Sequence, residues 1–473
     1  MNNKELGLTK TFKLSKRINS DDFIKDTRNL SDESNLQIAT AQARVYDKDQ
    51  TKDHDKLRKY ELTDETLEFD SYELYRIIAL RDFGSVKAGD LGGFIADESN
   101  LSHEGDCWVG DFAWVYDKAH IYGNAGVYGN ARVYGNARVY DNASVYDNAR
   151  VCGNAKVYGD AWVYDDTWVY DNASVYDNAW VYDNAEVSGG ARVYGSARVY
   201  ENALVDDATI SGNAKIYGNA AVIESAEVCN DVRVYGDAEV RGHCQIFHSA
   251  KIYGQARICD NANIFGNAEI YDDALVRDKA YVYGNAKIHG SACVADYASV
   301  TKTAEVCDDA EVCGNAVIWD NAVIGGTALV RGNAKVYGDT KVFGNAMVFG
   351  NAKIYNHVQI FDNAKVFENA MISGNARISG DAMIFGNTNV YDNACVYGKA
   401  QITGNSKIYA NAKIYDNVKV YDEARVHGNV EISGNIEILD KMDIFNNDQI
   451  NERKICSDIR IRKTEFKRSF LRL

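Results

Sequence analysis

The chain has 473 residues, no proline, 46% hydrophobic residues and a formal net charge of −16. This excess of acid disfavours a direct contact with duplex nucleic acid, whose phosphates require a basic surface. No run approaches the ~18 apolar residues of a membrane-spanning helix, and the first residues lack the apolar core of a secretion signal. We therefore expect a cytoplasmic protein with no membrane partner.

Residues 1–58 form a polar, charged arm that is poor in aromatic residues, which predicts that the arm is partly mobile. Within the arm, residues 40–46 (TAQARVY) resemble a piece of the repeat described below and predict one additional strand. Residues 59–108 alternate apolar and polar side chains around Asp/Ser turn signals, which predicts a small β-rich cap with a hairpin. Gly89, Gly92 and Gly93 are expected in turns, because the helix that a phosphate-binding loop requires does not follow them.

Residues 109–450 repeat a six-residue phrase close to Val-Tyr-(Gly/Asp)-Asn-Ala-x. In residues 131–134 (ARVY), strand alternation places alanine and valine on one side and arginine and tyrosine on the other. Gly135 and Asn136 then supply a turn, since both residues tolerate left-handed backbone angles. So short a strand cannot bury its own apolar face. Three repeat units make one coil, and coils stacked on one another form a triangular solenoid.

The phase of the repeat changes once. Inward aliphatic residues recur from Val109 to Val205, and the unit between Val205 and Ile210 is one residue short. From Ile210 the period continues unbroken to Ile450. We expect about 19 coils in a single long solenoid, with a register step at residues 205–210.

The pattern aliphatic–x–x–Asn–Ala–x is similar to the hexapeptide repeat of left-handed parallel β-helix proteins, a trimeric superfamily with many acyltransferases. The resemblance implies an all-β, left-handed parallel β-helix and a possible homo-oligomer. Residues 87–109 also resemble the N-terminal region of uncharacterised bacterial and prophage hexapeptide-repeat proteins that carry a provisional acyltransferase label. This chain departs from the superfamily in one respect, because tyrosine usually follows the aliphatic residue where a small residue is common.

Outward side chains exactly one coil apart along the chain are expected to stack on each other. Two tyrosine ladders follow, the first of Tyr122, Tyr140, Tyr158, Tyr176 and Tyr194, the second of Tyr128, Tyr146, Tyr164, Tyr182 and Tyr200. Trp162 should lie beside Trp180, and a corner ladder of Asn124, Asn142 and Asn178 should be interrupted by Asp160. Such ladders stabilise a strand surface. They also offer a wall on which a protein partner or a twin chain can dock.

An acyltransferase of this fold needs a catalytic histidine near a loop that leaves the helix. No insertion interrupts residues 210–450, so three histidines are expected to be plain surface residues: His289, His357 and His427. His103 and His120 are the catalytic candidates, because they lie about one coil apart beside the cap, close to Glu104 and Asp106. The resemblance implies acetyl-CoA as the acyl donor for such a site; otherwise no cofactor is expected.

Two groups of residues are candidate metal-binding sites. His243 and His248 are similar to the histidine pair of γ-class carbonic anhydrases, but no histidine occurs between His120 and His243, so a three-histidine site is incomplete. Three aspartates, Asp147, Asp165 and Asp183, follow one another at intervals of one coil, and a divalent cation would relieve their repulsion. Splaying into solvent relieves it equally well. The ten cysteines are scattered and are expected to be free thiols.

Residues 451–473 are basic and form a predicted cap or docking tail. The leading hypothesis is a non-catalytic rigid scaffold that presents its ladders for protein interaction or self-association. An acyltransferase with a site near the N-terminal cap is the alternative, so enzyme activity remains an open question. A third hypothesis is acidic mimicry of a nucleic acid.

Overall fold

A computed structural model describes residues 58–445, 449–450 and 461–463. Apart from the short 3-10 helix η1 (Glu98–Asn100), the regular structure of these residues is β-strand. Contacts divide the chain into two compact units, Met1–Glu201 and Asn202–Leu473, next to the register step. The repeat-like fragment 40–46, most of the arm and most of the basic tail lie outside the described residues.

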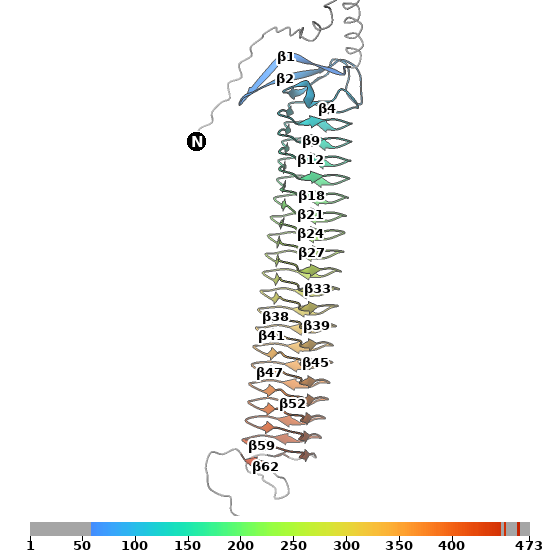
Figure 1. The fold of residues 1–473 in the computed structure, drawn as a ribbon. Helices are drawn as coiled ribbons and strands as arrows, with labels where there is room; N and C mark the ends of the chain where they lie inside the picture. The colour runs from blue at the N-terminus through green and yellow to red at the C-terminus, as the bar shows by residue number, and fades with distance from the viewer. Residues whose placement is uncertain (1–57, 446–448, 451–460, 464–473) are drawn as a thin grey trace, which may run out of the picture. The chain divides into compact units, whose positions relative to one another are not determined.

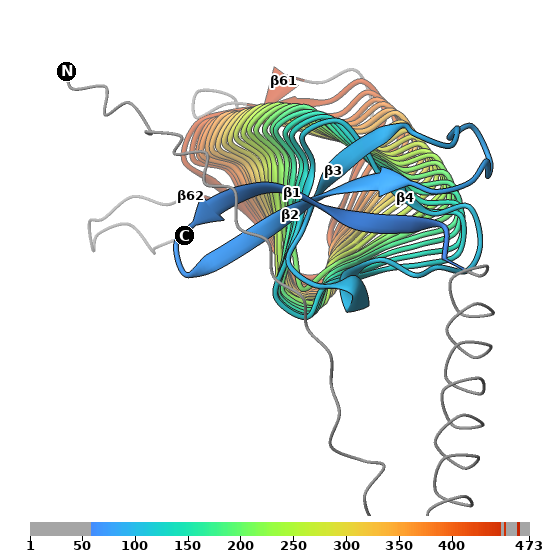
Figure 2. The same cartoon turned by 90° about the horizontal axis from the view of Figure 1, so that it is seen from above.

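The first unit begins with the predicted hairpin, which is confirmed. β1 (Tyr60–Phe69) pairs in antiparallel fashion with β2 (Tyr72–Ala79), and β2 pairs with β3 (Leu91–Ile95). β3 then pairs in parallel with β5 (Trp114–Val115) of an early coil. Figure 2 shows β1 and β2 lying across the end of the coils. The cap therefore covers strand edges that would otherwise be open to pairing with another chain.

The three glycines of this region have two different roles. Gly89 has a φ of +93° and is a turn glycine as predicted. The turn prediction is wrong for Gly92 and Gly93, which lie inside β3. A Cβ atom on Gly92 would come 2.5 Å from the Ile77 side chain, and one on Gly93 would come 2.5 Å from the carbonyl oxygen of Ala113. These glycines permit close packing of the cap on the first coils.

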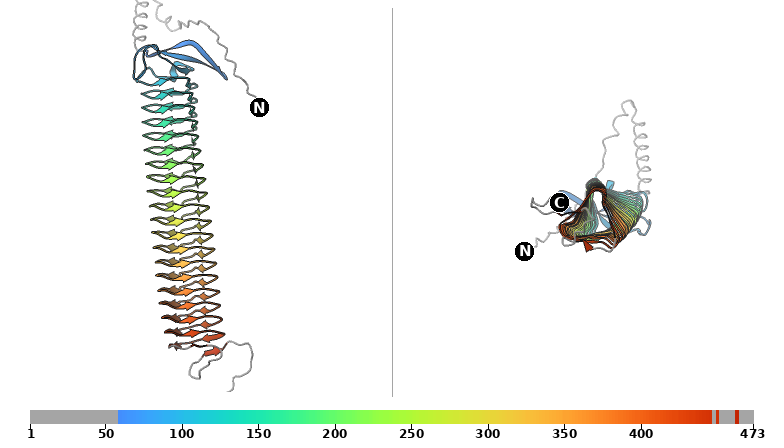
Figure 3. Two further views of the ribbon diagram at one scale, coloured as in Figure 1. Left: turned by 180° about the vertical axis from the view of Figure 1, so that it is seen from behind. Right: turned by 90° about the horizontal axis from the view of Figure 1, so that it is seen from below.

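Each coil buries the aliphatic and alanine positions and exposes the turn. β8 (Arg132–Val133) is typical, because Ala131 and Val133 are completely buried while Asn136 is exposed. β8 pairs in parallel with β11 (Arg150–Val151) of the next coil. Most strands of the repeat contain two residues, fewer than the four expected, because the turn takes the remaining positions. The predicted three-sided parallel solenoid is confirmed within each unit, and Figure 3 shows the coils of the second unit end-on.

The turn residues act differently from the prediction. The first turn position is left-handed, with φ of +71° at Gly135 and +58° at Asp141. Asn136, at the second position, is not among the residues with positive φ; its Nδ2 donates instead to Asn154 Oδ1 of the next coil at 3.0 Å. Asp141 Oδ2 accepts the backbone N–H of Gly159 at 3.2 Å. Aspartate therefore shares the left-handed position with glycine because its carboxylate offsets the backbone strain.

The second unit contains the register step. β20 (Leu204–Asp206) pairs with β23 (Ala221–Ile223) so that Val205 lies opposite Val222, one residue short of a regular coil. β21 (Thr209–Ile210) pairs with β24 (Glu227–Val228) at the regular spacing, which confirms the predicted step. The spacing then holds through to the pair of β58 (Glu431–Ile432) with β61 (Gln449–Ile450), as the stacked coils of this unit in Figure 1 show.

The last described strand of the unit differs from the coils. β62 (Ile461–Lys463) pairs in antiparallel fashion with β59 (Ile436–Ile438) and continues its sheet. In the described part of the chain, no helix has the length and apolar character needed to cross a membrane.

The left-handed turn position provides a stability test. Gly159 has a φ of +70°, and a Cβ atom there would lie 2.8 Å from the backbone nitrogen of Asp177. Gly159→Val is expected to lower the free energy of unfolding by about 2 kcal/mol, because a β-branched residue is strained in this conformation. Gly159→Asp is expected to cost about 1 kcal/mol or less, since the carboxylate can accept the Asp177 N–H. Chemical denaturation of the full chain measures both; equal losses would contradict the account.

Candidate functional site

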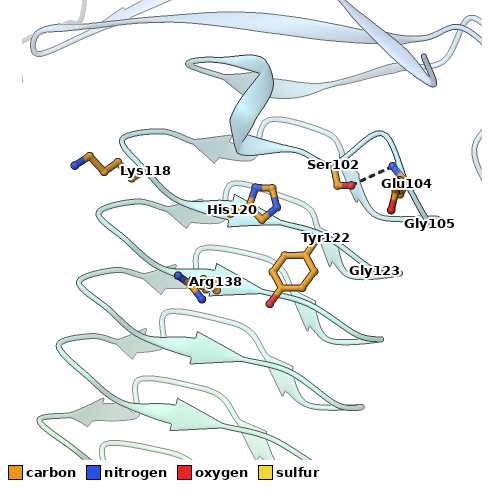
Figure 4. A pocket seen from close by; sticks show the side chains of 8 residues that line it. All are labelled: Ser102, Glu104, Gly105, Lys118, His120, Tyr122, Gly123 and Arg138. Carbon is orange, nitrogen blue, oxygen red and sulfur yellow. Dashed lines mark hydrogen bonds between the residues drawn. The ribbon is translucent and has the colours of Figure 1, made fainter. Parts of the chain in front are cut away.

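A pocket of about 660 Å³ opens beside the cap of the first unit. Figure 4 shows the residues that line it: Ser102, Glu104, Gly105, Lys118, His120, Tyr122, Gly123 and Arg138. They come from the segment that follows η1 and from two successive coils. The pocket therefore gathers one imidazole, two cationic side chains and one carboxylate. It lies in the region where the sequence placed its catalytic candidates.

His120 belongs to β6 (His120–Ile121), and its ring is held in a defined orientation. Its Nδ1 lies 2.6 Å from the carbonyl oxygen of Ser99. A carbonyl oxygen only accepts hydrogen bonds, so Nδ1 carries the hydrogen and Nε2 of the neutral ring is left as an acceptor. Such a tautomer is the one that a general base requires.

The short helix η1 supplies that carbonyl group, and buried Asn100 fixes η1 against the coil below. The Asn100 Nδ2 donates to the carbonyl oxygens of Ala119 at 2.8 Å and Asp117 at 3.2 Å. Asp97 closes a capping box with Asn100 at the start of the helix. The position of His120 is thus set by the segment that joins the cap to the coils.

His103 is not among the residues that line this pocket, although Ser102 and Glu104 on either side of it are. The His103 ring stacks on Tyr60 of β1 at 4.3 Å, and its Nε2 is buried without a hydrogen-bond partner among the described residues. Burial lowers the pKa of His103. The hairpin covers His103, whereas His120 lies on the outer surface of the coil.

The same covered region holds a buried lysine that sequence reasoning missed. Lys59 is completely buried, and its Nζ donates to the Cys107 carbonyl oxygen at 2.7 Å and contacts Cys107 Sγ at 3.0 Å. Burial lowers the pKa of Lys59 and raises the pKa of the Cys107 thiol. This contact joins the residue before β1 to the first coil. We find no sequence signal for it, because a single lysine at the edge of a polar arm predicts an exposed side chain.

Two of the three ladder aspartates, Asp165 and Asp183, each accept a backbone hydrogen bond from the next coil, which sequence reasoning did not foresee. Asp165 Oδ2 accepts the backbone N–H of Asp183 at 3.2 Å, and Asp183 Oδ2 accepts that of Glu201 at 3.1 Å. Each of these carboxylates is therefore satisfied by the next coil. His243 follows the left-handed Gly242 in one turn, and His248 occupies the left-handed position of the next turn, with φ of +64°. The two histidines lie at successive corners of the coil, so the arrangement does not bring them together.

The stacked ladders largely agree with the sequence. The first tyrosine ladder is complete, with ring centroids 4.8–4.9 Å apart between neighbours. The second is continuous from Tyr146 to Tyr200. Tyr128 departs from it, since its ring lies over Gly126, where a Cβ atom would come within 2.4 Å of the ring. Trp162 and Trp180 stack at 5.7 Å, as predicted.

The asparagine ladder also follows the predicted order. Asn124 Nδ2 donates to Asn142 Oδ1, and Asn142 Nδ2 donates to Asp160 Oδ1, each at 3.0 Å. The Asp160 side chain has no amide N–H to donate to the next coil, which explains why the ladder of amide hydrogen bonds stops at this residue.

Three tyrosines from two neighbouring coils of the second unit have exposed side chains. We refer to them as the aromatic patch: Tyr281, Tyr283 and Tyr297, which are 43%, 37% and 57% exposed. Phe265 stacks on Tyr283 at 4.9 Å, and Lys279 Nζ lies 5.4 Å from the Tyr297 ring centroid. Exposed tyrosines beside a cation are typical of protein-binding surfaces.

Comparisons with known proteins match the repeat. The family model described as YdcK beta solenoid repeat matches residues 131–147 and 149–165. A curated protein of Escherichia coli (strain K12), named uncharacterized acetyltransferase YdcK, is 41% identical over 63 residues, which are 12% of this chain and 19% of that protein. The chain thus spans about a fifth of the length of this relative. These matches and the parallel solenoid confirm the resemblance to hexapeptide-repeat proteins.

The tyrosine ladders give a pH test. Burial, with a smaller contribution from the neighbouring phenols, raises the pKa of Tyr140 and of Tyr164 to about 12. A raised pKa means that the folded chain holds the phenol proton more tightly than the unfolded chain, whose tyrosines titrate near ~10. This stability is therefore complete below about pH 10 and is lost between about pH 10 and 12.

The double variant Tyr140→Phe/Tyr164→Phe keeps the stacks and removes two of these phenols. Its melting temperature is expected to fall less than that of the wild type between about pH 10 and 12, and to equal it at pH 8. Thermal melts followed by circular dichroism measure this, with ultraviolet absorbance to follow tyrosine ionisation. An unchanged pH slope in the variant would count against the account.

Proposed function

We propose that the chain is a non-catalytic β-solenoid scaffold whose aromatic patch binds a protein partner. The observation that carries the proposal is the uninterrupted one-coil spacing from β21 to β61, without an inserted loop in the described part of the second unit. A loop that leaves the solenoid is what this fold needs to build a cleft for two substrates. A regular surface instead offers repeated contacts at fixed intervals.

The aromatic patch supplies the affinity in this proposal. Tyrosine is enriched among the residues that dominate protein interfaces, and truncating such a residue costs about 2 kcal/mol or more. Tyr281, Tyr283 and Tyr297 are exposed enough to be buried by a partner. The partner tested first is a second copy of the chain, because self-association needs no other component.

Sedimentation of the purified full chain tests this first partner. Association in the micromolar range is expected, and Tyr281→Ser/Tyr297→Ser is expected to weaken it by about tenfold or more. Asn351→Ser, an exposed change in a turn outside the patch, serves as the control and should leave association unchanged. A chain that stays monomeric removes the second copy as the partner.

A photo-activated cross-linker at position 297, compared with the same group at position 351, then tests other proteins in cells. One discrete cross-linked protein from position 297 alone supports the scaffold. Equal patterns from both positions contradict it.

The pocket beside the cap favours acyl transfer as a second candidate function. His120 Nε2 would accept the proton of an acceptor hydroxyl or amine, since the Ser99 carbonyl group holds Nδ1 as the donor. Lys118 and Arg138 line the same pocket and would bind the phosphates of an anionic acyl donor such as acetyl-CoA. The name of the Escherichia coli relative, an uncharacterized acetyltransferase, points to the same chemistry.

Calorimetric titration of the full chain with acetyl-CoA tests this second function, together with an assay for free thiol release. Under this proposal His120→Ala abolishes turnover but keeps binding, while Arg138→Ala weakens binding about tenfold. His357→Ala, which changes an exposed histidine paired with Asp339, is the control. Absence of both binding and turnover in the wild type excludes acetyl transfer and leaves the scaffold.

A further inference from the structure

One outward ladder of the second unit changes its chemistry partway along. Tyr217, Tyr235, Tyr253 and Tyr271 stack at 4.9–5.0 Å, and His289 continues the stack on Tyr271 at 4.8 Å. The equivalent positions of the next two coils are Cys307 and Gly325. At this ladder position, three successive coils therefore carry an imidazole, a thiol and a glycine in place of an aromatic ring.

The strand that precedes Cys307 places a carboxylate beside the imidazole and the thiol. β37 (Glu305–Val306) buries Val306, so Glu305 and Cys307 flank it on the outward side. His289 follows β34 (Lys287–Ile288) on the preceding coil, and its Nε2 lies 2.9 Å from Glu305 Oε1. The ligand atoms of His289, Glu305 and Cys307 all lie within 4.8 Å of one another.

We propose that His289, Glu305 and Cys307 form a binding site for Zn²⁺. Imidazole nitrogen, carboxylate oxygen and thiolate sulfur are all zinc ligands, whereas the sulfur ligand disfavours Ca²⁺ and Mg²⁺. Ligand atoms around a tetrahedral zinc ion lie about 3.5 Å apart, given bonds of about 2.0–2.3 Å. Small movements of the three side chains would therefore bring their ligand atoms to bonding distance from a single zinc ion. The fourth position would be taken by water, as in open zinc sites.

The electrostatics of the site suit a dication. Cys307 is buried, and its Sγ lies 3.9 Å from Asp308 Oδ2 and within 4.8 Å of a Glu305 carboxylate oxygen. The Asp308 and Glu305 carboxylates beside the thiol attract a divalent cation. Zinc binding would deprotonate the thiol outright, so that one sulfur–zinc bond forms as one proton is released to solvent.

A later coil of the same unit provides a matched control. His427 Nε2 lies 2.8 Å from Asp443 Oδ1, which repeats the pairing of His289 with Glu305 at the same spacing along the chain. The position equivalent to Cys307 is occupied by Phe445, whose ring stacks on His427. This second pair has the histidine and the carboxylate but lacks the thiol.

Titration of the full chain with Co²⁺ under thiol-protecting phosphine tests the site, because cobalt bound to thiolate absorbs strongly in the near ultraviolet. We expect one equivalent of Co²⁺ to give this band and Zn²⁺ to displace it. Cys307→Ser is expected to abolish the band, and His289→Ala to weaken binding about tenfold or more.

Two control variants, Cys313→Ser and His427→Ala, are expected to leave the band and the affinity unchanged. Circular dichroism establishes that each variant is folded. No thiolate band in the folded wild type, or a band that survives Cys307→Ser, overturns the proposal.

Discussion

The parallel backbone ladder, which pairs each strand with the equivalent strand of the next coil, is the constraint on which the structure of each unit depends. In the first unit the Tyr140 N–H donates to the Val157 carbonyl oxygen at 3.0 Å, and the neighbouring strands repeat this bond. Once the register is fixed, every side chain lies beside its equivalent one coil away. Valine then packs against valine inside the coil, and outside it tyrosine, asparagine or aspartate often lies beside a residue of the same type.

Because of this constraint, a residue that departs from the repeat changes the contacts with the equivalent residues of the neighbouring coils. Glycine at position 126, where the preceding coil has Trp108, lets Tyr128 fold over the backbone and leave its ladder. An asparagine replaced by Asp160 ends a chain of amide hydrogen bonds. Rings replaced by His289 and Cys307 bring metal-binding atoms together. Departures from the repeat therefore mark the places where a regular scaffold can acquire a specific site.

The sequence was sufficient for the features that follow from periodicity. The buried aliphatic positions, the step between Val205 and Ile210 and most of the tyrosine stacking are confirmed because each depends only on spacing. Contacts outside the repeat were missed. Burial of Lys59 against Cys107 depends on how the hairpin folds back, and the position of His120 depends on η1. The cluster around His289 was missed because we judged each histidine alone, although the ladder spacing places a cysteine directly beside it.

The register itself can be measured most directly by disulfide trapping. Arg138 and Lys156 are exposed partners in neighbouring strands of the first unit, one coil apart. Backbones paired at about 4.8 Å are within the range that a disulfide can bridge. Under mild oxidation, Arg138→Cys/Lys156→Cys is predicted to form the bond, identified by mass spectrometry of the peptides, whereas Arg138→Cys/Trp162→Cys, on different faces of the solenoid, is not. A bond in the second pair and none in the first would contradict the account.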